Sequence, residues 1–149
     1  MRVADVIRCA ICAALSIAAP VAQAQAQAQD AIGPRVQVEL NTAQSQTDNC
    51  TLTFLIQNGH AADIDRAVYE AVVFDTSGQV ERLTLFDFGP LPAARPRVRQ
   101  FVISGLSCDG ISQILINGAQ TCDAPDLDAT ACEDGLAVSS RSATLGLIG

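Results

Sequence analysis

The chain has 149 residues, a net charge of −7 and no lysine. Sixteen acidic residues outnumber nine arginines, which disfavours nucleic acid or an anionic membrane surface as a partner, because both are bound through concentrated positive charge. The length suits one domain.

Residues 1–24 have the pattern of a cleaved signal peptide. Two arginines precede an apolar, alanine-rich stretch over residues 9–22, and small residues then alternate with glutamine. The alternative is a membrane anchor, but the apolar run falls short of the ~20 residues of a spanning helix and contains Pro20. We therefore expect a periplasmic or secreted protein of a Gram-negative bacterium, with no membrane span after cleavage. A flexible segment over 25–34 and one domain over 35–149 should follow.

Cleavage after Ala24 leaves 125 residues, and removes two arginines and one aspartate, so that the mature charge is −8. From residue 35 onwards, short apolar runs of period two alternate with Gly, Pro, Asn and Asp, and no long run has the period of a helix. This pattern is typical of an all-β protein. Seven strands are expected, at residues 36–40, 50–57, 67–75, 80–88, 98–104, 111–117 and 136–140.

The segments between these strands indicate how they are connected. Asp75, Thr76, Ser77 and Gly78 form a turn signature, so the third and fourth strands should make a hairpin. Three prolines in GPLPAARP predict a crossing loop, and NTAQSQTDN reads as a polar connection. The third strand, AVYEAVVFD, is apolar on both faces, as in a central or an interface strand. We expect an immunoglobulin-like Greek-key β-sandwich, with a jelly roll or small barrel as the alternative.

Four cysteines follow the signal and should form two disulfides in an oxidising compartment. If successive strands run up and down, Cys50 and Cys108 lie at one end of the sandwich and Cys122 and Cys132 at the other. A bridge from Cys108 to Cys122 would need the ends of one extended strand to meet. The predicted pairs are Cys50 with Cys108 and Cys122 with Cys132. Four zinc-binding thiolates are the alternative, but the spacings lack Cys-x-x-Cys knuckles.

Acidic residues crowd around the shorter predicted disulfide loop. Carboxylates at this density could hold calcium, yet their spacing does not fit an EF-hand loop. The alternative is that Asp126 or Asp128 caps a short helical turn through Cys132, ended by Gly135, while the other acids face water. The acids concerned are Asp123, Asp126, Asp128, Glu133 and Asp134.

The only basic cluster of this acidic chain consists of Arg95, Arg97 and Arg99. An exposed arginine pair on one strand face could engage an acidic partner or a carboxylated glycan. The structural alternative is that these arginines form ion pairs with acids on neighbouring strands. His60, the single histidine, is expected in an exposed loop rather than as a general base beside Asp63 and Asp65.

Three segments, CTLTFLIQN, AVVFDTSGQV and LPAARPRVRQFVISGL, carry a resemblance that covers about residues 35–118. They resemble the small immunoglobulin-like modules of exported bacterial proteins, the group with CARDB-like and FxLYD-like domains. The resemblance implies a role in adhesion, assembly or accessory binding, with no catalytic residue, metal or cofactor to carry over. The four cysteines are a departure from that pattern.

Functions of different classes remain open. The leading hypothesis is a non-enzymatic envelope module that binds an unknown protein or envelope component through its loops or a sheet edge. A small hydrolase with a site built from scattered acids such as Glu70 and Asp87 is the second. A structural subunit that polymerises through edge strands is the third.

Overall fold

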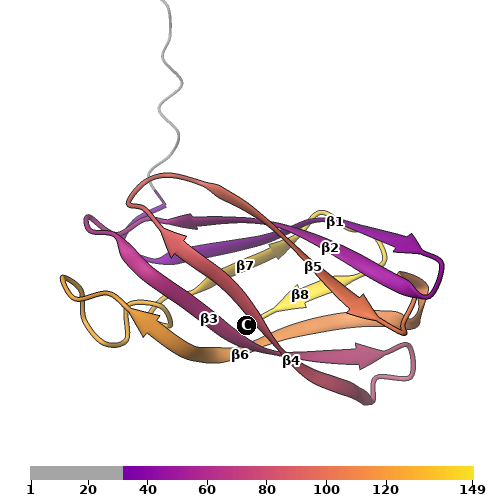
Figure 1. Cartoon of the computed structure of the whole chain (residues 1–149). Helices are drawn as coiled ribbons and strands as arrows, with labels where there is room; N and C mark the ends of the chain where they lie inside the picture. Colours follow the sequence, from indigo (N-terminus) through magenta and orange to yellow (C-terminus); the bar gives the residue numbers. More distant parts are fainter. Residues whose placement is uncertain (1–31) are drawn as a thin grey trace, which may run out of the picture.

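The computed structural model describes residues 32–149, and the predicted signal peptide and residues 25–31 lie outside this part. Two four-stranded sheets form a sandwich, as predicted (Figure 1). Sheet 1 has the strand order β5-β2-β1-β7, and sheet 2 has the order β4-β3-β6-β8. The strands are β1 (Val36–Gln46), β2 (Asn49–Asn58), β3 (Ile64–Asp75), β4 (Val80–Leu91), β5 (Arg97–Ser104), β6 (Ile111–Asp123), β7 (Ala137–Ser140) and β8 (Gly146–Ile148).

The connections follow a Greek-key pattern. β1 pairs with β2 and β3 with β4, while β5 returns to β2 and β6 returns to β3, all antiparallel. A short 3-10 helix, η1 (Cys108–Gly110), joins β5 to β6. We call the end of the sandwich that carries it the η1 end, and the opposite end, with the β2–β3 loop, the His60 end. The chain crosses between the layers where predicted, because β4 ends in sheet 2 and β5 begins in sheet 1, but Gly89, Pro90 and Leu91 of the predicted loop belong to β4.

Four strands are longer than predicted. β3 begins at Ile64 and β4 ends at Leu91, each three residues beyond its predicted bound, and the differences are larger for β1 and β6. β1 continues through most of the polar segment that we expected as a connection and pairs with β2 as far as Gln46. β6 does not end at Asn117 and Gly118, as predicted, but continues to Asp123. The register of its pairing with β3 shifts at this point. In both cases pairing with an adjacent strand satisfies the backbone, and this outweighs the weak strand preference of Asn, Gln and Gly.

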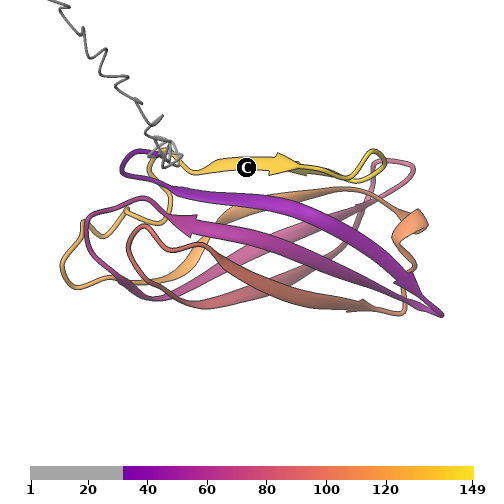
Figure 2. The same cartoon turned by 90° about the horizontal axis from the view of Figure 1, so that it is seen from above.

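The last part of the chain forms two strands where one was predicted. β7 pairs in parallel with β1 in sheet 1, and β8 pairs in parallel with β6 in sheet 2. Between them the Ser140 hydroxyl donates to the Leu145 carbonyl oxygen at 2.7 Å, and the Ser142 hydroxyl oxygen accepts from the Leu145 amide. β7 and β8 thus close the same side of both layers, which is seen from above in Figure 2.

Aromatic side chains fill the space between the sheets. Phe54 of β2 lies 5.3 Å from Phe86 and 5.8 Å from Phe88 of β4, centroid to centroid, and Tyr69 of β3 lies 5.8 Å from Phe88. Phe101 of β5 stacks on Phe86 at 4.5 Å. Because these rings come from both layers, their burial holds the sheets together.

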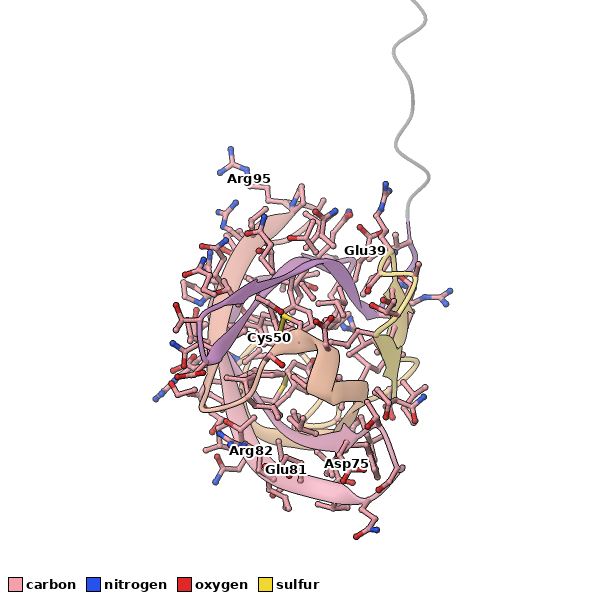
Figure 3. All side chains as sticks on the ribbon, turned by 90° about the vertical axis from the view of Figure 1, so that its right-hand side faces the viewer. Glu39, Cys50, Asp75, Glu81, Arg82 and Arg95 are labelled. Atoms are coloured by element: carbon pink, nitrogen blue, oxygen red, sulfur yellow. A yellow bond between two sulfur atoms is a disulfide. The ribbon has the colours of Figure 1, made fainter. Side chains whose placement is uncertain are left out.

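Both predicted disulfides are present. Cys50 and Cys108 have Cα atoms 4.7 Å apart at the η1 end, and Cys122 and Cys132 have Cα atoms 5.9 Å apart at the His60 end. Figure 3, seen along the strands, shows the Cys50 bridge between the layers. Zinc binding through four free thiolates is therefore excluded.

The predicted hairpin between β3 and β4 is confirmed as well. The Gly78 amide donates to the Asp75 carbonyl oxygen at 3.0 Å, and Gly78 has a φ of +82° that favours glycine. The Asp75 carboxylate accepts from the Ser77 hydroxyl at 2.6 Å and from the amides of Ser77 and Gln79. These bonds, led by that of the Ser77 side chain, lower the pKa of Asp75.

Candidate functional site

The long edge strands β4 and β5 lie at the same side of the sandwich, opposite β7 and β8. Along β5, Arg97, Arg99, Phe101 and Ile103 alternate with the more exposed residues between them. Ile103 is buried and Phe101 is half-buried against Phe86. The two arginines therefore continue the inward face of β5 toward the His60 end.

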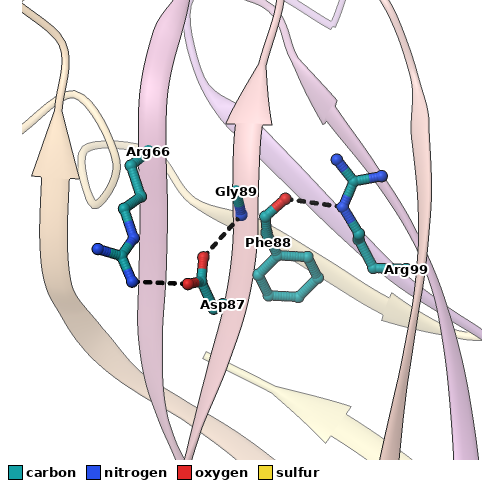
Figure 4. A network of polar contacts seen from close by, with 5 residues as sticks. All are labelled: Arg66, Asp87, Phe88, Gly89 and Arg99. Atoms are coloured by element: carbon teal, nitrogen blue, oxygen red, sulfur yellow. Dashed lines mark hydrogen bonds and ion pairs between the residues drawn. The ribbon is translucent and has the colours of Figure 1, made fainter.

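A β-bulge on β4 faces these arginines. Ala67 pairs with Gly89 and Val68 with Asp87, so Phe88 has no opposite residue on β3. Gly89 has a φ of +65°, a conformation that a side chain would strain. The Asp87 carboxylate accepts from the Gly89 amide at 2.9 Å and holds the bulge in place (Figure 4).

Arg66 and Arg99 hold the bulge from its two sides. Arg66 Nη2 lies 2.7 Å from Asp87 Oδ2, and its hydrogen bond lowers the pKa of Asp87. Arg99 Nε donates to the Phe88 carbonyl oxygen at 2.8 Å, so it links β5 in sheet 1 to β4 in sheet 2 (Figure 4). Arg82 Nη1 makes a second link between the same strands, donating to the Ser104 carbonyl oxygen at 2.9 Å.

None of the three clustered arginines forms an ion pair within residues 32–149. Arg97 donates to the Pro96 carbonyl oxygen and Arg99 to those of Phe88 and Val98. Arg95 lies in the crossing loop and projects outward (Figure 3). The ion pairs with acids on neighbouring strands, our structural alternative, are not formed. We call Arg95, Arg97 and Arg99 the arginine edge.

Other predicted candidates lie elsewhere. His60 lies in the β2–β3 loop as predicted but is half-buried rather than exposed, because its Nε2 lies 2.8 Å from the Ala131 carbonyl oxygen of the acidic loop. Glu70 accepts from Asn117 Nδ2 at 2.6 Å on the outer face of sheet 2. Neither Glu70 nor Asp87 is free, because both already bind a side chain of this protein.

The acidic loop between β6 and β7 is built of turns. Consecutive turns over residues 129–135 pass through Cys132, with the Asp134 amide 2.8 Å from the Thr130 carbonyl oxygen, and end at Gly135 with a φ of +67°, as predicted, although no helix is assigned there; neither Asp126 nor Asp128 caps them with its side chain. Glu133 accepts from the Ala119 amide at 2.7 Å, and Asp134 from the Thr130 hydroxyl at 2.6 Å. Among residues 32–149, no three His, Cys, Asp or Glu side chains are grouped as a metal site.

One polar residue with a central structural role was missed from the sequence. Asn58, one residue beyond the predicted end of the second strand, is fully buried at the His60 end. Its Nδ2 donates to the carbonyl oxygens of Ala62 and Leu91, both at 2.9 Å, and its Oδ1 accepts from the His60 amide. A buried amide with three backbone partners fixes the ends of β2 and β4 relative to each other.

The N-terminal side of β1 packs beside this residue. Of the segment 25–34, predicted to be flexible, the structure describes Ile32, Gly33 and Pro34, which precede β1. A Cβ atom placed on Gly59 would lie only 2.5 Å from an Ile32 side-chain carbon and 2.1 Å from the Gly33 carbonyl oxygen. Glycine at position 59 therefore allows this close approach.

Hollows on the surface lie away from the arginine edge. One of about 450 Å³ is lined by residues of the acidic loop, and one of about 250 Å³ lies between His60 and Asp134. No residue of the arginine edge lines either of them. Between residues 32 and 149 we find no helix with the length and apolar character needed to cross a membrane.

Comparison with known proteins finds no matching family model, and no curated protein or solved structure with significant similarity to the chain. The fold thus defines the class, an all-β sandwich with two disulfides. The resemblance to CARDB-like and FxLYD-like modules stays a prediction.

Proposed function

We propose that the protein is an exported, non-enzymatic binding module of the bacterial cell envelope that recognises an acidic segment of a partner protein through the arginine edge. The observation that carries this proposal is the lack of a carboxylate partner for Arg95, Arg97 and Arg99 in a chain with twice as many acids as arginines over residues 32–149. Within residues 32–149 the charge of Arg99 contributes to the lowered pKa of Asp87, whereas no carboxylate pairs with Arg95 or Arg97, whose charges are available to an external carboxylate.

The geometry of the edge supports recognition of carboxylates. Arg97 and Arg99 lie two residues apart on one face of β5, so their Cα atoms are ~7 Å apart. Each guanidinium has five N–H donors, and only one donor of Arg97 and two of Arg99 bind carbonyl oxygens. The remaining donors can bind carboxylates in the two-point geometry that arginine favours.

Two further observations support export and a binding role. Both pairs of cysteines are oxidised, as is usual for proteins outside the cytosol. Among residues 32–149, every buried polar side-chain atom has a hydrogen-bond partner, so these groups serve the fold. The two acids of the hydrolase alternative are also engaged, Asp87 by Arg66 and Glu70 by Asn117.

Binding of the oxidised mature protein to immobilised poly-glutamate tests the proposal. We expect binding that weakens as salt rises, and a loss of about tenfold in affinity for Arg97→Glu, which is ~1.4 kcal/mol. Arg35→Glu is the control, because Arg35, like Arg97, forms no ion pair within residues 32–149 but lies beside Gly135, next to the acidic loop; Arg35 is exposed, whereas Arg97 is half-buried. It changes the net charge by the same amount.

Three results would contradict the proposal. Arg97→Glu could bind like the unchanged protein, or Arg35→Glu could weaken binding equally, which would assign the effect to net charge alone. Binding to polygalacturonate without binding to poly-glutamate would assign the edge to a carboxylated glycan instead of a protein segment. Thermal melting of both variants confirms that each is folded.

A further inference from the structure

The edge strands of the sandwich differ in how well they are protected. Sheet 1 ends in β5 and β7, and sheet 2 ends in β4 and β8. β7 has four residues and β8 has three, while β4 carries the bulge at Phe88, followed by Gly89 and Pro90. Short strands, bulges and prolines keep an edge from pairing with another chain. Three of the four edge strands therefore have a protective device of this kind.

β5 lacks these three devices. Its eight residues, RVRQFVIS, contain no glycine, proline or lysine, and all of them pair with β2 without a shift of register. Its outer face carries two exposed β-branched side chains, Val98 at 59% and Val102 at 57%. A straight edge strand with these properties is a template to which a further strand can be added.

Two hydrogen bonds show which backbone groups of β5 point away from β2. The carbonyl oxygens of Val98 and Ser104 each accept from an arginine side chain, at 3.1 Å and 2.9 Å, so both face the open edge. The N–H and C=O of one residue in an antiparallel strand point to the same side, and the side alternates along the strand. The backbone groups of Gln100 and Val102 therefore face the open edge as well. Within residues 32–149 no strand pairs with β5 on that side.

The same arginine contacts set the length of the free edge. Because the carbonyl oxygens of Val98 and Ser104 already have a donor, an added strand finds its free acceptors on the residues between them. Gln100 and Val102 each offer one N–H and one C=O, so a neighbouring strand can exchange about four backbone hydrogen bonds with them. This number suits an extended segment of about five residues.

Arg97 and Arg99 decide which segment fits. Both lie on the inward face of β5, where an added strand would place every second side chain beside them. β5 itself contains no acid, so the same strand of a second copy would leave both arginines without a carboxylate. Charges that point inward at an edge reject such strands and favour one with complementary charges. A segment with acids at alternate positions meets this requirement.

We propose that the acidic segment bound at the arginine edge adds to β5 as a fifth strand of sheet 1, with acidic and aliphatic residues in alternation. This inference rests on the proposed function and adds the conformation and sequence pattern of the partner segment. Its acids meet Arg97 and Arg99 on the inward side, and its aliphatic residues meet Val98 and Val102 on the outer side. A slip of one residue would turn the acids away from the arginines, so the charges fix the register.

N-methylation of the backbone of a peptide tests the added strand, because it removes hydrogen-bond donors without changing any charge. The probe is a capped peptide of alternating valine and glutamate, and its binding to the oxidised mature protein is compared with that of two methylated forms. One form is methylated at every valine amide and the other at every glutamate amide. An added strand turns only every second N–H toward β5, so one form should lose about tenfold in affinity or more, while the other should bind like the unmethylated peptide.

A pair of variants tests the same contact from the side of the protein. Gln100→Pro removes an edge amide and leaves the three arginines in place, and it should weaken binding of the alternating peptide about tenfold. Gln100→Ala is the matched control, because it keeps that amide, and it should bind like the unchanged protein. Circular dichroism shows whether each variant is folded, and the methylated peptides decide the question if Gln100→Pro is not.

Equal binding of the two methylated peptides overturns the added strand. So does self-association of the protein that Gln100→Pro abolishes, because it would assign the edge to a second copy. The proposed function is judged separately, by binding to poly-glutamate and by Arg97→Glu. Methylated forms that bind equally, together with binding to poly-glutamate that Arg97→Glu weakens, would leave the arginine edge as a carboxylate site without strand addition.

Discussion

The Tyr69 hydroxyl donates a hydrogen bond of 2.7 Å to the carbonyl oxygen of Cys132, inside the core of the His60 end. Tyr69 is fully buried on β3, and Cys132 belongs to the shorter disulfide loop. The bond therefore joins the central strand of sheet 2 to the acidic loop. Burial, together with the carboxylate of Glu133, raises the pKa of Tyr69 above its ordinary value.

This bond makes stability at high pH depend on one residue. A raised pKa in the folded state means that the neutral tyrosine stabilises the fold below the ordinary tyrosine pKa, and that stability falls as pH rises above ~10. The chain has no lysine and one tyrosine, and the mature cysteines are bridged, so few other groups titrate there. Alkaline unfolding should therefore coincide with the appearance of tyrosinate absorbance.

Tyr69→Phe separates the two roles of the side chain. It should lower the free energy of unfolding by about 1–2 kcal/mol at neutral pH, because the Cys132 carbonyl loses its partner, and should remove the loss of stability above pH ~10. Denaturant unfolding at neutral and alkaline pH measures both effects. A folded protein whose tyrosine ionises near its ordinary pKa would contradict this account.

The two disulfides should contribute unequally to stability. Cys50 and Cys108 are 58 residues apart, and Cys122 and Cys132 are 10 apart, so the first closes the larger loop of the unfolded chain. Loop entropy predicts a loss of about 4 kcal/mol for replacing the first pair by alanine and about 3 kcal/mol for the second. Guanidinium unfolding of the two double variants checks the order. A larger loss for the short loop would show that local contacts dominate.

Replacement of Asn58 should be far more damaging than replacement of Asn117. Asn58→Ala leaves the carbonyl oxygens of Ala62 and Leu91 without their donor, and we expect a loss of about 2–3 kcal/mol in the free energy of unfolding. Asn117 is exposed and binds only Glu70, so Asn117→Ala should change it by no more than about 0.5 kcal/mol. Equal losses would refute the bracing role of Asn58.

The hairpin of β3 and β4 should respond to acid through Asp75. Its lowered pKa means that the carboxylate stabilises the fold above the ordinary pKa of aspartate, and that this contribution is lost as pH falls through the lower folded value. Asp75→Ala should melt at a lower temperature near pH 7, and the difference should shrink in acid. If NMR gave Asp75 a pKa at or above the ordinary value of aspartate, that result would argue against the three hydrogen bonds at the turn.

Short-range patterns were sufficient for much of the fold. Alternation in CTLTFLIQN marks β2, and the residues from Asp75 to Gly78 define the hairpin turn. The disulfide pairing followed from two assumptions: successive strands run in opposite directions, and the two ends of an extended strand cannot meet. These features depend on side-chain period, on turn residues or on chain length, all of which are written locally in the sequence.

Long-range contacts decided the rest. Backbone pairing with a neighbour extended β1 and β6 beyond their apolar runs, and divided the chain after Leu136 between two sheets. The bulge at Phe88, the bracing by Asn58 and the hydrogen bond from Arg82 to Ser104 each join residues far apart in the chain. Such pairings depend on the register between strands, which a single strand's sequence does not contain.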